Sequence, residues 1–528
     1  MDACTHRCSG TRLGPDWNRL PVRLPPRLTL YEINAATWLE RLGRVRGRPL
    51  GLGEVPAAEW DALAALPVDA VWLMGVWQRS PKGLHIALAD PGLDVEFHAA
   101  LPDLRSEDVI GSPYCVRDYV VDDRFGGPEG LAAAREQLAA RGLGLILDYV
   151  PNHVAPDHPW TRERSECLLP GTEQDLAEHP DMFIRTAGGI AARGRDPYFP
   201  PWPDVVQLNA FSPALREAVA DTLFGLAAQC DGLRCDMAML MTNEVFARTW
   251  GTRAGPAPAE DYWSTLIPRV KREYPDMLFI AEAYWDMEWT LQEQGFDLCY
   301  DKRLYDRLLH DPADSVRGHL QAERSYQERL IRFIENHDEP RAAASFESAQ
   351  TRAAAVVMST LQGARLYHDG QFEGRRTHLP VFLGREPEEQ PDPELAAFYR
   401  RLLRAVADAE VREGEWQLCV LEGWSDNDSY RRLVAWCWAT PQSRHLVAVN
   451  LSAESAQARV RLPWDDLAGE AWGLEDRLDG HVFEREGDEL AGEGLYVALG
   501  PWGLHFLALS PHPVGMMRAP RRSETVTM

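Results

Sequence analysis

Acidic side chains stand near the ends of four short apolar runs in this sequence. Asp148, Asp236 and Glu282 lie near the ends of the first three runs, and Asp338 follows the fourth. Polar and basic residues accompany them, namely Asn152, His153, Arg234, Glu335 and His337. Taken alone, any one of these residues can have a purely structural role, either in an ion pair or as a buried side chain whose hydrogen bonds are all made. Burying a charge is costly unless it is paired or used, so the whole set predicts a functional site.

Two carboxyl groups of this kind can cleave an acetal bond between sugars. One carboxyl group must be protonated so that it can give its proton to the leaving oxygen, and the other must be ionised and lie on the opposite face of C1. When the two carboxyl groups are about 5–5.5 Å apart, the reaction passes through a covalent intermediate and the configuration at C1 is retained. Arg234 lies two residues before Asp236 on the same strand face and favours its ionised form, which predicts Asp236 as the nucleophile. Glu282 has apolar neighbours and other carboxylates nearby, which raise a carboxyl pKa and predict the acid/base.

The elements that must position these groups are short apolar runs separated by amphipathic stretches. This alternation is typical of β-α-β units and a parallel sheet. Eight parallel strands favour a closed (β/α)8 TIM barrel, whose chemistry lies at the C-terminal strand ends, over an open doubly wound sheet. The eight candidate strands are Thr29–Ile33, Ala70–Val76, Leu143–Val150, Gly232–Ala238, Leu278–Tyr284, Leu298–Tyr300, Leu330–Ile334 and Ala364–His368.

Two segments interrupt the alternation. Residues 153–205 exceed an ordinary βα loop of about 2–6 residues and predict a small inserted subdomain over the barrel mouth. From about Glu413 to Ser510, short strands with Gly, Asp and Asn turns predict an antiparallel β-sandwich domain. The predicted boundaries are an N-terminal extension at 1–27, the barrel at 28–152 and 206–409, the inserted subdomain at 153–205, the β-domain at 410–510 and a disordered tail at 511–528.

Composition limits the classes of function. The 528 residues are 45% hydrophobic, enough to bury one large and one smaller domain. A net charge of −25 disfavours nucleic acid as a partner, and no apolar run reaches the roughly 18 residues of a membrane helix. Nine scattered cysteines without a CxxC pair, and an N-terminal stretch without the apolar core of a signal peptide, predict a cytoplasmic protein. We expect a neutral small-molecule ligand, and the oligomeric state stays open.

Four segments carry a specific resemblance to a known family. Asp148-Tyr-Val-Pro-Asn-His153, Gly232-Leu-Arg-Cys-Asp236, Ala281-Glu282-Ala and Glu335-Asn-His-Asp338 resemble, in order and spacing, the four conserved regions of the α-amylase superfamily, glycoside hydrolase family 13. The segments Ser112–Tyr119 and Gln207–Asn209 are also similar to the family. The resemblance covers about residues 28–510 and implies a retaining enzyme that acts on α-glucans or related oligosaccharides.

The resemblance also implies roles for residues around the two acids. Asp338 would be the third acid, which holds sugar hydroxyls and stabilises the oxocarbenium-like transition state. His153 and His337 would bind hydroxyls of the same ring, and Tyr114 would stack on it. The outer subsites would be lined by aromatic residues that can equally pack in the core, namely Trp160, Tyr198, Phe199, Trp202 and Trp285.

The sequence departs from the family pattern in two places. Met239 and Leu240 stand where family α-amylases commonly have a Lys and a His that serve the product side and a calcium site. Asn152 remains a calcium candidate, but it lacks a convincing set of Asp partners, so no metal or other cofactor is predicted. Arg341 is present as a substrate-binding candidate, but Cys115 replaces the Asp that often pairs with this Arg in exo-acting α-glucosidases.

Three functions stay open at this point. The first hypothesis is hydrolysis of α-glucosidic bonds in malto-oligosaccharides or related α-glucosides. The second is transfer of glucosyl or maltosyl units to a sugar or phosphate, because a covalent intermediate reacts with whichever nucleophile reaches it. The third is a non-catalytic sugar-binding scaffold, against which the presence of all three acids argues.

Overall fold

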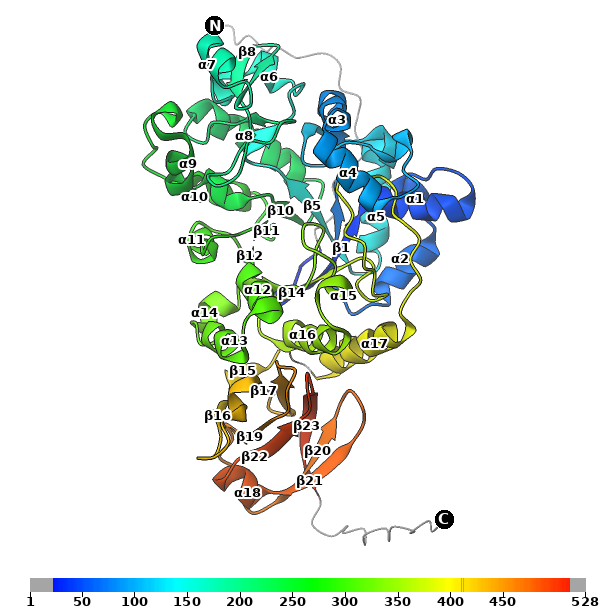
Figure 1. The fold of residues 1–528 in the computed structure, drawn as a ribbon, viewed down its shortest axis with the longest axis vertical. Helices are drawn as coiled ribbons and strands as arrows, with labels where there is room; N and C mark the ends of the chain where they lie inside the picture. Colours follow the sequence, from blue (N-terminus) through cyan, green and yellow to red (C-terminus); the bar gives the residue numbers. More distant parts are fainter. Residues whose placement is uncertain (1–21, 410, 412, 513–528) are drawn as a thin grey trace, which may run out of the picture. The chain divides into compact units, whose positions relative to one another are not determined.

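The computed structural model describes residues 22–409, 411 and 413–512 of the chain (Figure 1). These residues form two compact units, and each is described separately. The first unit contains the described residues up to Tyr305 together with Glu323–Ser345 and Gly363–Pro393. The second contains Asp306–Ala322, Phe346–Gln362 and the described residues from Glu394 onward.

A closed barrel of eight parallel strands forms the centre of the first unit. Its order is β1-β14-β13-β12-β11-β10-β5-β2, and β1 pairs with both β14 and β2, which closes the ring. This confirms the predicted barrel and excludes the open sheet. Its strands are β1 (Thr29–Asn34), β2 (Ala70–Met74), β5 (Gly144–Tyr149), β10 (Gly232–Cys235), β11 (Leu278–Ala281), β12 (Leu298–Tyr300), β13 (Leu330–Arg332) and β14 (Ala364–His368).

The barrel strands are almost continuously buried because both of their faces are covered. Helix α8 (Pro213–Ala227) shows how the sequence sets the helix before a strand. The Ser212 side chain accepts a hydrogen bond from the Leu215 N–H, and Pro213 occupies the first turn, where its missing N–H has no cost. Other helices in this part of the chain are α1 (Ala35–Arg46), α2 (Ala57–Ala64), α3 (Pro81–Leu88), α4 (Pro91–Ala100), α5 (Gly127–Ala139), α9 (Asn243–Trp250), α10 (Tyr262–Lys271), α11 (Glu288–Glu293), α12 (Lys302–His310), α14 (Arg324–Gln327) and α15 (Ala342–Ser345).

A long excursion follows β5. Strand β6 (His153–Val154) pairs antiparallel with β9 (Val206–Gln207), so the chain returns beside the point where it left the barrel. The pairing fixes both ends of this segment. It contains α6 (Trp160–Glu163), α7 (Glu173–Glu178) and the hairpin of β7 (Phe183–Thr186) with β8 (Gly189–Ala192). Earlier in the chain, β3 (Trp77–Arg79) pairs antiparallel with β4 (Val116–Val121), and α3 and α4 lie in the segment between them.

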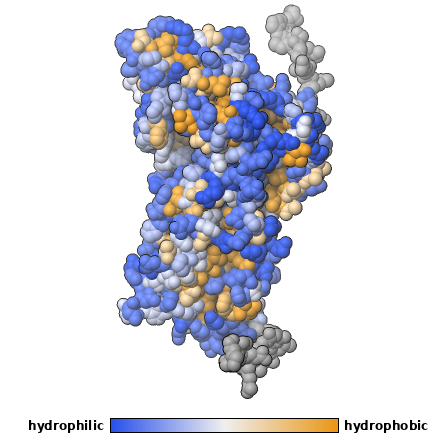
Figure 2. Space-filling model, turned by 45° about the vertical axis from the view of Figure 1, so that its right-hand side comes forward, coloured by the Kyte–Doolittle hydropathy of each residue, from blue (hydrophilic) through white to orange (hydrophobic). Residues whose placement is uncertain are grey.

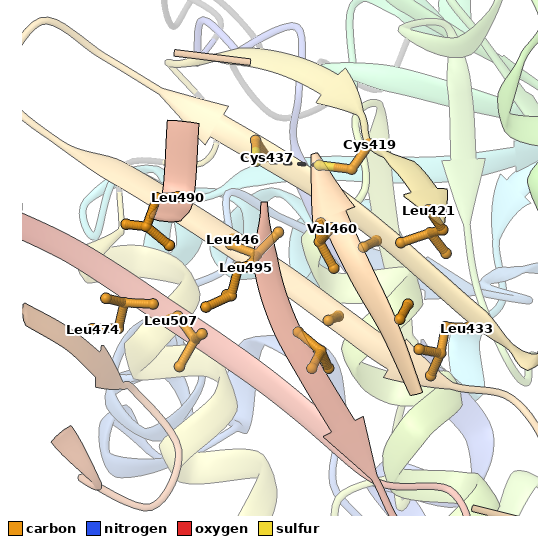
Figure 3. Close-up of a cluster of buried hydrophobic side chains, with 14 of the residues drawn as sticks. Cys419, Leu421, Leu433, Cys437, Leu446, Val460, Leu474, Leu490, Leu495 and Leu507 are labelled. Atoms are coloured by element: carbon orange, nitrogen blue, oxygen red, sulfur yellow. Dashed lines mark hydrogen bonds between the residues drawn. The ribbon is translucent and has the colours of Figure 1, made fainter. Parts of the chain in front are cut away.

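The second unit contains the predicted antiparallel β-sandwich. A six-stranded sheet has the order β15-β17-β18-β23-β20-β21, and a three-stranded sheet has the order β16-β19-β22. Buried apolar residues from both sheets form one core (Figure 3). The elements are β15 (Glu415–Leu418), β16 (Val420–Glu422), β17 (Leu433–Ala439), β18 (Arg444–Asn450), β19 (Ala456–Arg461), β20 (Ala471–Asp476), β21 (Val482–Glu486), α18 (Gly487–Gly492), β22 (Leu495–Leu499) and β23 (Leu504–His512).

Besides the part of α12 from Asp306 onward, three helices also belong to the second unit, although the predicted boundaries placed them with the barrel. They are α13 (Ala313–Leu320), α16 (Ser348–Thr360) and α17 (Pro393–Asp408), the last apart from its first residue. The indoles of Trp436 and Trp438 on β17 both donate hydrogen bonds to the Thr360 carbonyl, at 3.1 and 2.6 Å. The compact unit therefore begins well before the boundary predicted at residue 410.

The predicted terminal segments lie mainly outside the described residues. Within the tail predicted at 511–528, Pro511 and His512 instead belong to β23 and pair with Trp472 and Ala471 of β20. Pro511 lies beyond the last residue that pairs with β18, where a missing N–H is tolerated. Residues 513–528, and residues 1–21 of the predicted extension, are not among those that the structure describes.

The face drawn in Figure 2 is mainly hydrophilic, with hydrophobic patches between the polar side chains. Among the described residues, no helix has the length and apolar character needed to cross a lipid bilayer.

Candidate active site

The three predicted catalytic acids follow the C-terminal ends of barrel strands. Asp236 comes directly after β10, Glu282 directly after β11, and Asp338 six residues after the end of β13. Parallel strands present these ends at one rim. All three acids line one cavity of about 370 Å³, within the range of roughly 300–1,000 Å³ that is typical of small-ligand sites.

Arg234 on β10 joins the three carboxyl groups. Its Nη1 lies 2.6 Å from Oδ1 of Asp236, and its Nη2 lies 2.8 Å from Oε2 of Glu282 and 3.7 Å from Oδ2 of Asp338. Burial alone would lower the pKa of this guanidinium, but the surrounding negative charges hold it well above its usual value. Because one guanidinium bridges Asp236 and Glu282, these two carboxyls face the same small space.

Glu282 has the environment of a proton donor. Its Oε2 accepts a hydrogen bond from the Met237 N–H at 2.6 Å, and its Oε1 accepts one from the Tyr284 hydroxyl at 2.8 Å. Burial raises the pKa of Glu282 to about 7; Arg234 opposes this shift and Asp236 adds to it. Near neutral pH, a large fraction of this carboxyl is therefore protonated, as a general acid requires.

The turn after Asp236 is built to hold the acid in place. Met237 has φ of 41°, a left-handed conformation that a residue with a side chain rarely adopts. This conformation directs its N–H at Glu282, and the next amide, from Ala238, donates to the Glu282 carbonyl at 3.1 Å. The Trp263 indole donates to the Ala238 carbonyl at 2.8 Å and secures the turn. Such strain is typical of functional sites.

Asp338 has the opposite electrostatic environment. Burial would raise its pKa, but the charge and hydrogen bond of His337, with help from Arg234, lower it to about 2. His337 is itself held between two carboxylates, with Nε2 3.0 Å from Oδ2 of Asp338 and Nδ1 2.5 Å from Oε1 of Glu32. Burial lowers the pKa of His337, yet Asp338 and Glu32 raise it well above its usual value. Asp338 is also the most open of the three acids, with 40% of its side chain exposed.

Two other predicted binding residues line the same cavity. The Tyr114 hydroxyl lies 2.6 Å from Nε2 of His337, and the two rings stack with centroids 5.4 Å apart. The His153 ring contacts the Trp202 ring at 5.3 Å. Burial lowers the pKa of His153, although Asp236 opposes this, so the imidazole is neutral at pH 7 and can both donate and accept hydrogen bonds.

Arg341 and Trp285 do not line this cavity. Nη1 of Arg341 donates to Oε1 of Glu335 at 2.6 Å and to the Asp369 carbonyl at 2.9 Å, which makes it part of a buried ion-pair network. Trp285 packs edge-on against Tyr198, with ring centroids 4.8 Å apart.

The surroundings of Asn152 do not fit a calcium site. Its Oδ1 already accepts a hydrogen bond from Nε2 of Gln207 at 2.8 Å, and its Nδ2 lies 3.3 Å from Nδ1 of His153. Calcium prefers several oxygen ligands, with carboxylates among them. Across residues 22–409, 411 and 413–512, no group of three His, Cys, Asp or Glu side chains is placed to hold a metal ion.

Glu32 and Tyr284 contact the site but were not predicted from the sequence. Glu32 is fully buried and lies inside the first predicted strand. An acidic residue within an otherwise apolar run is unusual, and this signal in the sequence could have marked Glu32 as a site residue. Tyr284 carries no comparable signal, because a tyrosine near a strand end is ordinary. Asp148 was predicted as part of the functional set, but it does not line the cavity. It accepts hydrogen bonds from the Trp72 indole at 3.1 Å and from the Gly75 N–H at 2.9 Å, so its role is structural.

A family model described as "Alpha amylase, catalytic domain" matches residues 58–436. The chain belongs to the α-amylase family. This confirms the resemblance inferred from the four segments.

Individual family members are distant in sequence. The chain is 25% identical over 412 residues to alpha-amylase MalA of Haloarcula japonica, which covers 75% of this chain and 51% of that protein. It is 29% identical over 227 residues to a 1,4-alpha-glucan branching enzyme of Albidiferax ferrireducens, covering 40% of this chain and 33% of the other. The chain therefore spans about half of the first relative and a third of the second.

Solved structures of the family share the fold. The α-amylase of H. orenii superposes with a TM-score of 0.64 at 18% identity and covers 92% of this chain and all of its own. An α-amylase of Geobacillus thermoleovorans in complex with acarbose gives 0.63 at 16% identity, with 92% and 99% covered. At these identities the likeness concerns the fold, which agrees with the predicted barrel and β-domain.

Proposed function

We propose that the protein is a retaining glycosidase that hydrolyses α-glucosidic bonds in malto-oligosaccharides or related α-glucosides. The observation that carries this proposal is the pair Asp236 and Glu282, bridged by Arg234 over one cavity, with Glu282 able to keep a proton near pH 7. The names of family members, including an alpha-amylase and an oligo-1,6-glucosidase, support a substrate of this class.

The proposed reaction has two steps. In the first, Glu282 gives its proton to the glycosidic oxygen while a carboxylate oxygen of Asp236 attacks C1; the C1–O bond to the leaving sugar breaks and a C1–Asp236 ester bond forms. In the second, ionised Glu282 takes a proton from water, the resulting hydroxide attacks C1, and the Asp236 carboxylate leaves. Both carboxyls return to their starting protonation states.

The remaining groups in and beside the cavity would bind the sugar ring whose bond is cleaved; His337 does not line the cavity itself but contacts Asp338 and Tyr114, which do. Asp338 stays ionised because charged His337 faces it, so it can accept sugar hydroxyls and stabilise positive charge that develops at C1. His337 and neutral His153 would hold ring hydroxyls, with Tyr114 beside them.

Further sugar units would leave the cavity along an aromatic surface. Trp202 lines the cavity, while Tyr198 and Phe199 of the same segment are 57% and 66% exposed. Trp285 contacts Tyr198, so it would contribute to an outer subsite rather than to the cavity. Trp160 packs on His158 with ring centroids 5.0 Å apart, and we assign it no substrate.

Transfer to a sugar or phosphate acceptor is the second candidate. Met237 and Phe382 make part of the wall of the cavity that holds Glu282 apolar, whereas Met239 and Leu240 are buried and do not line it. An apolar wall favours a sugar acceptor, whose ring has an apolar face, over water, but it does not favour phosphate. One experiment separates the candidates: the protein is incubated with maltoheptaose, with and without maltose or phosphate, and the products are identified by mass spectrometry. Shortened chains alone indicate hydrolysis, whereas longer chains or a sugar phosphate indicate transfer. If no member of a broad panel of glucosides is turned over, the result favours a binding scaffold.

We also propose that the protein acts without a metal ion and in the cytoplasm. The surroundings of Asn152 support the first point. Seven described cysteines are free and buried, which agrees with a reducing compartment. Activity after dialysis against a chelator and localisation of the tagged full-length chain test these two points.

A further inference from the structure

The two oxygens of Glu282 have different hydrogen-bond environments. Oε2 accepts the Met237 N–H at 2.6 Å and forms an ion pair with Nη2 of Arg234 at 2.8 Å, whose N–H groups are not aligned for a hydrogen bond, so one donor and one positive charge lie against it. Among the residues that the structure describes, Oε1 meets one group, the hydroxyl of Tyr284, at 2.8 Å. A hydroxyl can act as donor or acceptor, whereas the amide and the guanidinium can only donate. A proton on Oε2 would therefore lie against the Met237 amide hydrogen and the positive charge of Arg234, whereas a proton on Oε1 would meet neither.

We infer that Glu282 carries its catalytic proton on Oε1, and that Tyr284 is a positioning residue that holds this oxygen toward the bond to be cleaved. This inference rests on the proposed function of Glu282 as the acid/base. It adds a residue that lies two positions further along the chain and also lines the cavity.

A strained turn fixes Tyr284. The two residues after it, Trp285 and Asp286, have φ of 61° and 62°, which places both side-chain-bearing residues in the left-handed region. Such residues cost free energy and persist only where the surroundings hold them. An ion pair between Asp286 and Arg303 and the ring contact of Trp285 with Tyr198 provide that support. The chain thus leaves β11 with Tyr284 held against the acid.

The charged groups around Tyr284 keep its hydroxyl protonated. Besides Glu282, the carboxylates of Asp338 and Glu339 face it, and Lys302 pairs with Glu339 at 3.2 Å. Burial first, and then these negative charges, raise the pKa of Tyr284 well above its usual value. Tyr284 therefore does not replace Glu282 as the acid; it donates a hydrogen bond to Oε1.

This bond matters most while the proton leaves. As the glycosidic oxygen takes the proton from Oε1, Glu282 becomes negative, and the Tyr284 hydroxyl stabilises the charge that forms on that oxygen. Arg234 stabilises the other oxygen, and the neighbouring charges of Asp236 and Asp338 oppose ionisation. Tyr284 keeps its own proton throughout. The same bond also favours the ionised form of Glu282 in the free enzyme, because hydrogen bonds to a charged form stabilise it.

The test compares two substrates for Tyr284→Phe and the unchanged protein. Maltoheptaose has a leaving group that needs a proton, whereas α-maltosyl fluoride loses fluoride with little need for one. We expect kcat/KM for maltoheptaose to fall by about tenfold to a hundredfold, and for the fluoride by less than about threefold. The alkaline limb of the pH profile for maltoheptaose should move to higher pH, because Glu282 loses a bond to its ionised form.

Two variants separate the possible outcomes. Tyr262→Phe removes another buried hydroxyl, which meets that of Tyr149 at 3.1 Å, and should leave both substrates unaffected. Equal losses on both substrates, or no loss on either, in Tyr284→Phe would overturn the inference. Glu282→Gln tests the proposed function itself: if it still cleaves maltoheptaose at a normal rate, the function fails, whereas a loss there without one in Tyr284→Phe removes the role of Tyr284 alone.

Discussion

The rim of the barrel and the core of the C-terminal sandwich are both buried, but they contain opposite kinds of side chain. At the rim, Arg234 and Glu282 are almost fully buried charges held by ion pairs and directed hydrogen bonds. The sandwich core is built around a cluster of buried hydrophobic side chains (Figure 3), and buried polar residues such as Asn450 and Asp476 lie at the ends of its strands. Buried charge is expensive and buried apolar surface is favourable. We therefore expect substitutions at the rim to change chemistry and substitutions in the sandwich core to change stability.

The largest effect should come from removing either reacting carboxyl at the rim. Asp236→Asn and Glu282→Gln should each lower kcat on maltoheptaose by about a thousandfold or more, because each deletes a group that reacts directly. Neither change alters side-chain volume, so circular dichroism and the melting temperature should show a folded protein. Turnover near that of the unchanged protein in either variant would contradict the assignment.

A change in the sandwich core should have the complementary outcome. Leu446→Ala deletes a fully buried side chain and should lower the free energy of unfolding by about 2–5 kcal/mol, measured by urea denaturation. The kcat of the protein that stays folded should not change. Val482→Ala is the matched control, since Val482 is 62% exposed and its loss should cost under about 0.5 kcal/mol. A core variant with normal stability and altered kcat would break the comparison.

Glu32 tests whether a buried charge at the rim acts through its neighbours. In Glu32→Gln, His337 loses one of the two carboxylates that raise its pKa, so it should lose its proton at a lower pH than in the unchanged protein. Below the new pKa, activity should be close to normal; above it, neutral His337 no longer holds Asp338, and kcat should fall by about tenfold or more. An unchanged pH profile of kcat would show that Glu32 serves only packing.

The pH profile of the unchanged protein gives a smaller effect. Because the pKa of Glu282 is about 7 and its protonated form is the active acid, kcat/KM should fall with increasing pH above about 7. The pKa of Asp338 is about 2, so this group should cause no loss between pH 3 and the alkaline limb. An alkaline limb that persists in Glu282→Gln, measured with α-maltosyl fluoride, would have to come from another group.

Removal of metal ions should have no measurable effect. The Asn152 amide is already hydrogen-bonded to Gln207, so exhaustive dialysis against EDTA should leave both kcat and the melting temperature unchanged. If EDTA lowers either quantity and calcium restores it, the protein holds a metal that the described residues do not indicate.

The sequence predicted the barrel well because its strands are continuous apolar runs of the right length. Strands were predicted too long where a turn of the site follows them. Strand β10 ends at Cys235 rather than at Ala238, because Met237 adopts a left-handed backbone conformation in which its N–H bonds to Glu282. Helix α16 groups with the sandwich because the indoles of Trp436 and Trp438 both donate hydrogen bonds to the Thr360 carbonyl. A contact between residues so far apart in the sequence cannot be predicted from a local sequence pattern.

The candidate site was predictable where charges interrupt apolar runs. Asp236, Glu282 and Asp338 carry that signal and meet in one cavity. Tyr284 does not carry it, since its role depends on which oxygen of Glu282 is free. Arg341 was a candidate only through its position in the family pattern, and its partner is Glu335 in a structural ion pair.

One measurement tests the central claim most directly. Glu282→Gln should still accept a maltosyl group from α-maltosyl fluoride, because fluoride needs little proton assistance, but it lacks the base that would release the group. Peptic digestion and mass spectrometry after a short incubation should then find a maltosyl ester on the peptide that contains Asp236. Fluoride release without any adduct, or an adduct on a different residue, would contradict the account of Asp236 as the nucleophile.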